Sequence, residues 1–370
     1  MRCSVCFLIL MVALADASAG QFKKAAYHNA GTRPYQVVAA RLTNSGNVDL
    51  VVADYLTSQI IVLLGNGDGT FRKPTTFSIA VPIALAVGDF NNDGKEDLAV
   101  VEYGGTGDSV IAILLGDGTG KFRQSASYPS GVETTGVAVA DFNGDGNQDV
   151  AVANNAGNVM VFFGTGKGTL RKPTTYNLPS HTIPYGIAAG DLNGDHSPDL
   201  AVAEDGAGSV AILLNDGTGK FLKPVTYNAG GGEAVDVQIA DLRNNGDQDL
   251  VIANASQGLV VLLNKGNGTF GQPAIYPPTC QDCVAPMACV VADFNLDSKL
   301  DVACATNIDD SYLFYGKGNG KFGPPIPIDD TIHFQGGFGI ATGDFNNDGA
   351  PDLAIPIELK GKVALMINTK

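Results

Sequence analysis

The chain has 370 residues, of which 47 are glycine and none is tryptophan, and its formal net charge is −15 at pH 7. Abundant glycine with few aromatic residues is typical of many short strands joined by tight turns, and it argues against long helices. The sequence has no basic stripe that could neutralise phosphates, so we expect no nucleic-acid partner.

The first 19 residues are typical of a secretory signal. Arg2 supplies a positive charge, residues 5–15 are apolar, and the Ala-Ser-Ala sequence at residues 17–19 is a cleavage site. A membrane anchor is the alternative, but the apolar run is short for a bilayer and Asp16 interrupts it. We therefore expect residues 20–370 to be secreted or extracellular, without membrane insertion, and the periplasm and the cell surface stay open as destinations.

The sequence contains repeats of about fifty residues, and the N-terminus of the mature chain is expected to close them into a ring. Residues 20–27 match the segments at 120–128 and 219–227, which follow glycine hairpins and are predicted outer strands. The last repeat stops at Asn368, where its own outer strand should begin. We predict that the N-terminal strand completes the last repeat and removes an exposed sheet edge.

An acidic nine-residue segment recurs along the chain. Its fullest copy is Asp-Phe-Asn-Asn-Asp-Gly-Lys-Glu-Asp at residues 89–97. Further copies begin at Asp141, Asp191, Asp241, Asp293 and Asp344, and a decayed first copy begins at Arg41. A fixed period near fifty residues indicates a repeat architecture.

Each repeat predicts four short strands. Glycine-rich turns separate the four strands. Examples taken from different repeats are residues 149–153 for the strand after the acidic segment, 110–115 for the next, 122–128 for the third and 136–140 for the strand that leads into the next acidic segment. The strands are near-continuous apolar runs, which indicates cover on both faces. The expected fold is all-β: one seven-bladed β-propeller of four-stranded antiparallel blades over residues 20–370.

The acidic segments are candidate metal loops. Side chains at positions 1, 3 and 5 of an extended loop point to one side, glycine at position 6 permits a left-handed turn, and a carboxylate at position 9 closes the cage. Asp and Asn oxygens without His or Cys favour calcium, although such clusters also form ordinary turns. The apolar residue at position 2 is expected to face the core.

The loops differ in completeness. His196 and Ser298 occupy the glycine position in two of them, with Gly194 displaced in the first, and Arg243 and Asn245 replace ligands in the Asp241 loop. We expect about five calcium ions, or six if the Asp241 loop binds weakly. The predicted ligands are Asp89, Asn91, Asp93, Asp97, Asp141, Asn143, Asp145, Asp149, Asp191, Asn193, Asp195, Asp199, Asp293, Asn295, Asp297, Asp301, Asp344, Asn346, Asp348 and Asp352, with Asp241, Asn245 and Asp249 as weak ones.

The first copy of the loop has lost its ligand set. Arg41, Thr43 and Ser45 stand at positions 1, 3 and 5, and only Asp49 survives at position 9. We hypothesise that Arg41 pairs with Asp49 in place of an ion.

Four cysteines fall within one repeat: Cys280, Cys283, Cys289 and Cys304. In an exported protein they favour two disulfides. A hairpin folded about the Asp293 loop would place Cys289 nearly opposite Cys304, and Cys280 would then join Cys283. A four-cysteine zinc site and free buried thiols are the alternatives.

With these loops, the four-strand repeats and segments such as Tyr-Asn-Ala-Gly at residues 227–230, the chain resembles the FG-GAP/VCBS repeat family. That family includes the propeller heads of integrin α subunits and many bacterial exported proteins, and the resemblance covers residues 20–370. It implies structural calcium between the first two strands of a blade. It also implies recognition on the opposite face, as in integrin heads, or between blades, as in some propeller lectins.

The opposite face offers candidate ligand-binding residues. Tyrosines with polar neighbours could stack on sugars or anchor a protein, and the alternative is that they only pack on their neighbours. We expect a monomeric recognition module for carbohydrate or an extracellular protein, acting in adhesion or assembly. The candidates are Tyr35, Tyr55, Tyr103, His181, Tyr185 and His333, accompanied by Arg33, Glu133, Asp205, Asp309 and Phe334.

Catalytic motifs are absent from the sequence. The histidines stand in no motif with a nucleophile, and neither G-x-S-x-G nor H-E-x-x-H occurs. We predict no enzyme. The alternative is a polysaccharide-active lyase or hydrolase on a calcium-bearing propeller, which a cluster of His, Arg and Tyr in one cleft would favour.

Overall fold

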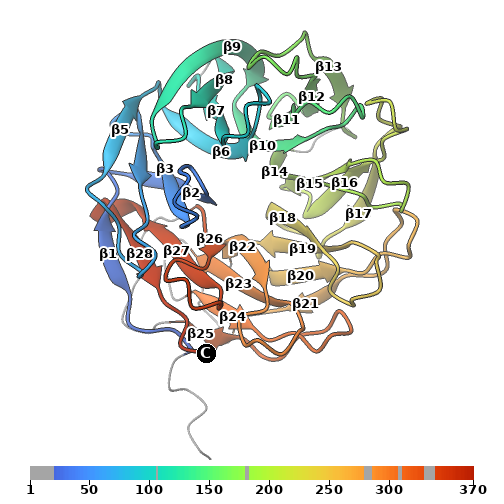
Figure 1. Cartoon of the computed structure of the whole chain (residues 1–370). Coiled ribbons are helices and arrows are strands. Elements are labelled where there is room, and N and C mark those ends of the chain that lie inside the picture. The colour runs from blue at the N-terminus through green and yellow to red at the C-terminus, as the bar shows by residue number, and fades with distance from the viewer. Residues whose placement is uncertain (1–20, 106, 180–182, 279–285, 307–310, 329–337) are drawn as a thin grey trace, which may run out of the picture.

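The computed structural model describes residues 21–105, 107–179, 183–278, 286–306, 311–328 and 338–370. Within these ranges, seven four-stranded antiparallel sheets form a ring (Figure 1). The expected seven-bladed propeller is therefore confirmed. The predicted signal at residues 1–19 lies outside the described residues.

The blades follow one another along the chain, each beginning with its innermost strand. Blade 1 contains β2 (Pro34–Ala40), β3 (Asp49–Asp54), β4 (Gln59–Leu63) and β5 (Thr75–Ser78), and blade 2 contains β6 (Pro82–Gly88), β7 (Asp97–Glu102), β8 (Asp108–Gly116) and β9 (Phe122–Val132). Blade 3 contains β10 (Thr134–Ala140), β11 (Asp149–Asn154), β12 (Asn158–Phe162) and β13 (Thr174–Asn177), and blade 4 contains β14 (Ile183–Gly190), β15 (Asp199–Asp205), β16 (Ser209–Leu213) and β17 (Val225–Asn228). Blade 5 contains β18 (Ala234–Ala240), β19 (Asp249–Asn254), β20 (Gly258–Leu262) and β21 (Ala274–Tyr276), and blade 6 contains β22 (Pro286–Ala292), β23 (Asp301–Thr306), β24 (Tyr312–Phe314) and β25 (Ile326–Pro327).

Blade 7 joins the two ends of the chain. It contains β26 (Ala341–Gly343), β27 (Asp352–Ile357) and β28 (Lys362–Met366), with a short 3-10 helix, η1 (Glu358–Lys360), before β28, and its outer strand is β1 (Ala26–Asn29). Strand β1 pairs antiparallel with β28 and lies beside it in Figure 1. The predicted closure by the N-terminal strand is confirmed.

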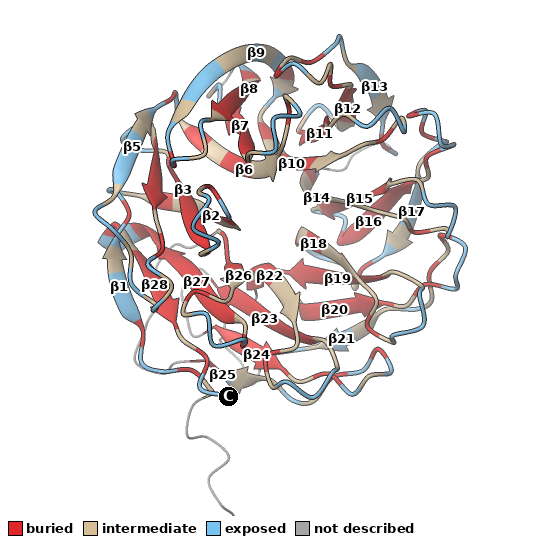
Figure 2. Cartoon of the chain, in the orientation of Figure 1, coloured by how far each residue is buried: buried red, intermediate tan, exposed pale blue. Residues whose placement is uncertain are grey.

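Blade-on-blade packing buries the middle strands. Every residue of β3, β11, β19 and β27 is buried, whereas the outer strands β5 and β13 are mostly exposed (Figure 2). Core clusters cross blade boundaries, as where Val52 of blade 1 packs with Ala354 of blade 7. Apolar side chains on both faces of these strands are therefore removed from water, which explains the near-continuous apolar runs.

The inner strands approach one another closely around the axis. A Cβ on Gly136 would lie 2.4 Å from the Tyr185 carbonyl oxygen, and a Cβ on Gly186 would lie 2.8 Å from the Asp236 Cα. Only glycine fits where two neighbouring inner strands come this close together. These two glycines set how closely blades 3, 4 and 5 converge.

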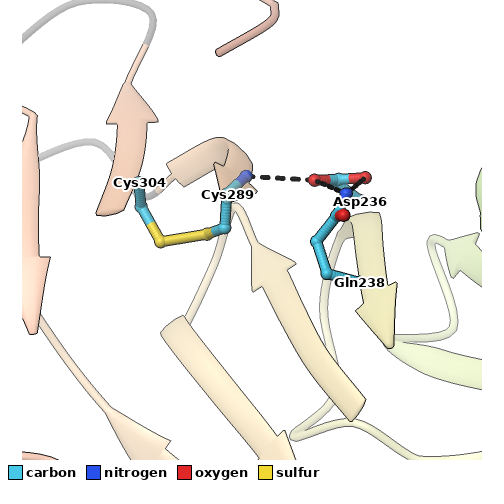
Figure 3. Close-up of a disulfide and its surroundings, with 4 residues drawn as sticks. All are labelled: Asp236, Gln238, Cys289 and Cys304. Atoms are coloured by element: carbon cyan, nitrogen blue, oxygen red, sulfur yellow. Dashed lines mark hydrogen bonds between the residues drawn. A yellow bond between two sulfur atoms is a disulfide. The ribbon is translucent and has the colours of Figure 1, made fainter. Parts of the chain in front are cut away.

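A disulfide joins the first two strands of blade 6. Cys289 of β22 lies directly opposite Cys304 of β23, with an S–S distance of 2.05 Å (Figure 3). This confirms the predicted pairing, and it makes the four-cysteine zinc alternative wrong because these two sulfurs are bonded to each other. Cys280 and Cys283 lie outside the described residues.

The part of the chain that the structure describes contains no helix with the length and apolarity needed to cross a membrane.

Candidate functional site

The acidic loops connect the first and second strands of each blade and lie at one end of the ring. Their position-9 aspartates are the first residues of the second strands and are fully buried. In blade 2, Asp97 accepts hydrogen bonds from the Phe90 amide at 2.9 Å and from the Gly116 amide at 2.7 Å. The position-9 carboxylate thus fastens its own loop to the following hairpin.

Asp49 in the decayed first loop forms the same two bonds. It accepts from the Leu42 amide at 3.0 Å and from the Gly65 amide at 2.8 Å. Asp49 can therefore join its loop to the following hairpin without a metal ion. It gives a physical reason why Asp49 is present although the other ligands are gone.

Backbone amides hold the remaining oxygens in place. In blade 2, Asp89 accepts from the Gly94 amide at 2.8 Å and from the Asp93 amide at 3.2 Å, and Asn91 Oδ1 accepts from the same Asp93 amide at 2.9 Å. Shared donors bring the side chains of positions 1 and 3 to one side of the loop. The position-1 aspartates of blades 3, 4, 6 and 7 accept the position-6 amide in the same way.

Two positions are left-handed in each of the six loops of blades 2 to 7, one more than the sequence predicted. Position 6 has φ of 79° at Gly94, 68° at His196 and 65° at Ser298. Position 4 is also left-handed, with φ of 80° at Gly194 and 59° at Leu296. The interpretation of Gly194 as a displaced glycine is therefore wrong, because it occupies the normal position 4. The recurrence of Asn and Gly at position 4 was the signal.

The position-2 side chains are buried in the core, as predicted. They are Phe90, Phe142, Leu192, Leu242, Phe294 and Phe345.

The charges within a loop repel one another. Burial raises the pKa of Asp97 to about 6, and the nearby negative charges of Asp89 and Asp93 add to this rise while amide hydrogen bonds oppose it. The pKa of the position-9 aspartate is likewise raised to about 6 by burial in four other loops, at Asp149, Asp199, Asp301 and Asp352. A divalent cation among such oxygens would relieve both the repulsion and the desolvation.

The donor chemistry fits a hard cation held by mixed ligands. Among the described residues, no group of three His, Cys, Asp or Glu side chains forms a metal cluster by itself. The expected set also includes the position-3 asparagine, and calcium loops commonly add a backbone carbonyl oxygen to such side-chain ligands. Calcium binding at these loops stays a prediction.

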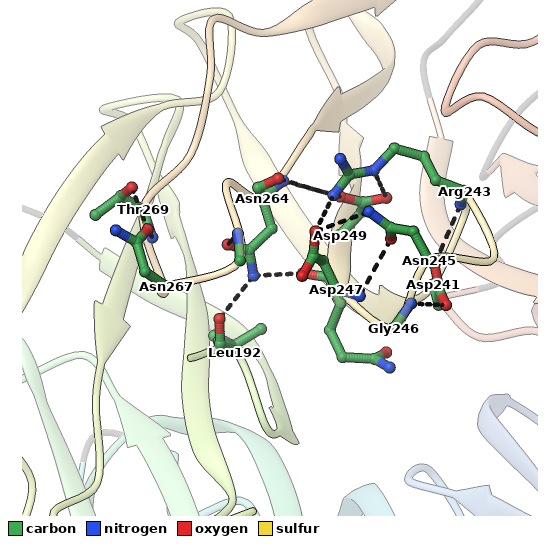
Figure 4. Close-up of polar contacts among 12 residues, drawn as sticks. Leu192, Asp241, Arg243, Asn245, Gly246, Asp247, Asp249, Asn264, Asn267 and Thr269 are labelled. Atoms are coloured by element: carbon green, nitrogen blue, oxygen red, sulfur yellow. Dashed lines mark hydrogen bonds and ion pairs between the residues drawn. The ribbon is translucent and has the colours of Figure 1, made fainter. Parts of the chain in front are cut away.

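In blade 5 a guanidinium lies among the loop carboxylates (Figure 4). Arg243 at position 3 donates to the two Asp249 oxygens at 3.0 and 2.8 Å, and it lies 3.4 Å from Asp247. It also donates to the Asn264 carbonyl oxygen at 2.7 Å. Arginine at position 3 with aspartate at position 7 was the sequence signal for this contact.

Arg243 changes the electrostatics of its loop. Burial raises the pKa of Asp249, and the Arg243 hydrogen bond and charge oppose that rise. The weak binding predicted for this loop now has a physical reason, because a cationic side chain already contacts the position-9 carboxylate.

The corresponding hypothesis for the first loop is wrong. Arg41 is exposed and donates to the Gly46 carbonyl oxygen at 3.0 Å, and it forms no ion pair with Asp49 within the described residues. Thr43 and Ser45 bond each other at 2.8 Å between their hydroxyl oxygens. The first loop is therefore closed by hydrogen bonds, without an ion pair between Arg41 and Asp49 among the described residues.

The opposite end of the ring carries the predicted tyrosines. Tyr35 is the second residue of β2, Tyr185 lies early in β14, and Tyr55 and Tyr103 directly follow β3 and β7. All four therefore lie at the strand ends away from the acidic loops. His181 and His333 lie outside the described residues, as do Asp309 and Phe334.

Three of these tyrosines gather with polar partners. Tyr35 stacks on Phe338 with ring centroids 4.5 Å apart and meets Tyr55 edge-on at 5.7 Å. Its hydroxyl oxygen lies 3.3 Å from that of Tyr185, which comes from blade 4. Arg33 donates to the Tyr55 hydroxyl at 2.7 Å.

A cavity of about 200 Å³ lies on the axis beside this cluster, and all seven blades line it. Tyr35 and Tyr185 are among the lining residues, so the structure brings two predicted candidates to one site. Asp236 and Gln238 also line the cavity and were not predicted. Two polar residues inside the otherwise apolar strand β18 were the signal for them.

The grouping that would favour an enzyme is incomplete in the described residues. Arg33, Tyr55 and Glu358 meet, with Arg33 3.2 Å from the Glu358 carboxylate. No histidine is among the described residues that line the cavity. His28 instead packs on Phe71 at the outer rim, with ring centroids 4.9 Å apart.

Known structures share the fold. A lectin from Agrocybe aegerita, described as recognising non-reducing terminal N-acetylglucosamine, is 19% identical with a TM-score of 0.58, over 88% of this chain and 86% of that one. The BP39L lectin from Burkholderia pseudomallei is 14% identical with a TM-score of 0.66, over 92% and 97% of the two chains. BBS1N in complex with ARL6DN is 13% identical with a TM-score of 0.66, over 95% and 98%. These likenesses concern the fold.

Sequence comparison identifies the repeats themselves. A search of curated proteins found no match. The FG-GAP-like repeat, in contrast, matches residues 41–100, 89–152, 141–202, 191–252, 241–304 and 293–355, in steps that follow the blades. The chain therefore belongs to the FG-GAP-like repeat family.

Proposed function

We propose that the protein is an exported recognition module, stabilised by calcium in its acidic loops, that binds carbohydrate or a protein partner through the opposite face. The observation that carries the binding role is the axial cavity with its aromatic and polar rim, Tyr35, Tyr55, Tyr185 and Phe338. Concave sites with a few convergent polar groups are the usual ligand sites of proteins.

The calcium proposal rests on the contrast between loops. Where the ligand set is complete, burial raises the pKa of the position-9 carboxylate, and the negative charges of the position-1 and position-5 aspartates add to this rise. Where position 3 is Arg243, a guanidinium contacts the position-9 carboxylate. This replacement supports the view that the complete loops have room for a cation.

Calcium is proposed to have a structural role. The loops and the tyrosine cluster lie at opposite ends of the inner strands. An ion that binds only the folded form stabilises it by about 2.7 kcal/mol per site at one hundred times Kd. We therefore expect ligand binding to depend on calcium through the integrity of the fold.

Export is supported by the signal-like residues 1–19 and by the Cys289–Cys304 disulfide, since disulfides persist in oxidising compartments. Both proposed ligand classes occur on this fold, because the similar structures include two lectins and a protein–protein complex. No observation favours a catalytic role.

A glycan-array screen of residues 20–370, in calcium and again with a chelator, tests the proposal. Calcium-dependent binding to one family of sugars supports a lectin. A blank array from folded protein, followed by saturable capture of one extracellular protein, supports the protein-partner form. Folded protein that fails both screens would overturn the recognition role.

A further inference from the structure

The axial cavity has one charged side chain among the described residues that line it. Asp236 supplies that charge, and Lys, Arg and His are absent from this lining. A carboxylate removed from water without a counter-charge is unfavourable. The remaining polar side chains of the lining are Tyr35, Gln36, Thr135, Tyr185 and Gln238.

Neutral donors hold the Asp236 carboxylate in position (Figure 3). Asp236 Oδ2 accepts from the Cys289 amide at 3.0 Å, and the Gln238 amide nitrogen lies 3.3 and 3.2 Å from the two carboxylate oxygens. Burial raises the pKa of Asp236, and these hydrogen bonds oppose the rise. The donors fix the orientation of the carboxylate without cancelling its charge.

Two buried carboxylates of this chain lie beside arginines. Glu358 lies 3.2 Å from Arg33, and Asp249 lies 2.8 Å from Arg243. Each therefore has a guanidinium partner. Asp236 is half-buried and forms no ion pair within the described residues, which leaves its charge open to a cationic ligand.

Aromatic groups complete the cavity. Tyr35 stacks on Phe338, and its hydroxyl oxygen lies 3.3 Å from that of Tyr185. Burial strongly raises the pKa of Tyr35, so its phenol stays neutral at physiological pH. Neutral aromatic rings attract cations through their negative faces.

We propose that the axial cavity binds a small organic cation, whose protonated amino group pairs with Asp236 and whose body packs against Tyr35 and Tyr185. A cavity of about 150 Å³ accommodates benzene. The axial volume of about 200 Å³ therefore suits a compound built on one six-membered ring. This inference rests on the proposed recognition role and names a ligand class for that face.

Calorimetric titration with matched probes tests the inference. The charged probes are glucosamine, cyclohexylamine and benzylamine, and their uncharged counterparts are N-acetylglucosamine, cyclohexanol and benzyl alcohol. At least one amine should bind the calcium-loaded protein about 10- to 100-fold more tightly than its counterpart, as expected for a charged hydrogen-bonded pair.

Variants assign that preference to one carboxylate. Asp236→Asn should abolish the preference for the amine, whereas Asp216→Asn should keep it, since Asp216 is an exposed residue of an outer hairpin. Since Asp236→Asn could disturb folding, a second measurement uses unchanged protein. Raising the pH through the pKa of the amine itself deprotonates the ligand and should weaken its binding.

Several outcomes would overturn the inference: no amine binds, the uncharged counterpart binds equally well, or Asp236→Asn retains the preference. If the glycan array is positive but no amine binds, this inference is wrong and the proposed recognition role is retained. If an amine binds but the sugar and protein screens both fail, the assignment of the cavity is retained and the proposed carbohydrate and protein partners are excluded.

Discussion

The Arg243 guanidinium lies 2.8 Å from the Asp249 carboxylate, in the loop where arginine replaces asparagine at position 3. In the neighbouring loops the corresponding carboxylate accepts the position-2 amide, but here Arg243 Nε donates to that oxygen at 3.0 Å. The Leu242 amide instead donates to the Ala240 carbonyl oxygen. Arg243 thus substitutes for a backbone contact and supplies the positive charge.

Arg243→Asn should convert this loop into an ion site. Without calcium the variant should lose about 1–3 kcal/mol of unfolding free energy, because a buried carboxylate loses its charged partner. Calcium should restore the loss and raise the number of bound ions by one, measured by calorimetry or elemental analysis. Arg41→Asn is the control, since Arg41 forms no such pair, and it should change neither quantity. An unchanged ion count in Arg243→Asn would contradict the proposal.

Calcium removal should lower the thermal midpoint of the wild-type protein in proportion to the number of occupied loops. Asp145→Asn weakens one complete loop of blade 3, so it should reduce the ion count by one and make the chelator-induced drop smaller. Each lost site should account for about 2.7 kcal/mol at one hundred times Kd. Identical melting curves with calcium and with chelator would refute the structural role.

Leu296→Asn should stabilise the protein by about 1 kcal/mol, because Leu296 adopts φ of 59° and asparagine tolerates the left-handed region better. Little burial is lost, since Leu296 is 51% exposed. Leu222→Asn is the matched control: Leu222 is 52% exposed and is absent from the left-handed residues. Urea denaturation measures both, and equal effects of the two substitutions would count against backbone strain.

Deleting residues 20–29 should lower the thermal midpoint. The deletion removes β1 and leaves the edge of β28 unpaired, which also exposes a surface prone to aggregation. Thermal denaturation and light scattering measure the two effects. An unchanged midpoint would mean that the ring does not depend on its N-terminal strand.

His28 should make the same closure sensitive to acid. Burial lowers the pKa of His28, with a smaller effect from Lys362, and its buried Nε2 atom has no hydrogen-bond partner among the described residues. The folded-state pKa thus lies below the unfolded value of about 6.5, so the stability contribution is complete above that pH and is lost as the pH falls. His28→Phe should flatten the dependence of unfolding free energy on pH between about 5 and 7. A slope equal to that of wild type would exclude His28 as its source.

The repeat itself was sufficient to predict the fold and its closure. A fifty-residue period, near-continuous apolar strands and the match of residues 20–27 to the outer strands follow from local chemistry that recurs in every blade. Cys289 and Cys304 were likewise predictable as neighbours, because they flank one hairpin.

Contacts between distant residues required the tertiary structure. Tyr35 meets Tyr185 from 150 residues away, and Asp236 meets Cys289 from 53 residues away, because ring closure brings all the inner strands to one axis. The sequence carried a signal for the Arg243 contact, but local spacing did not reveal that Arg41 bonds the Gly46 carbonyl oxygen and not Asp49. The repeating pattern determined the scaffold and the candidate calcium loops, whereas the convergence of different inner strands on one axis determined the axial cavity and placed Asp236 in its lining.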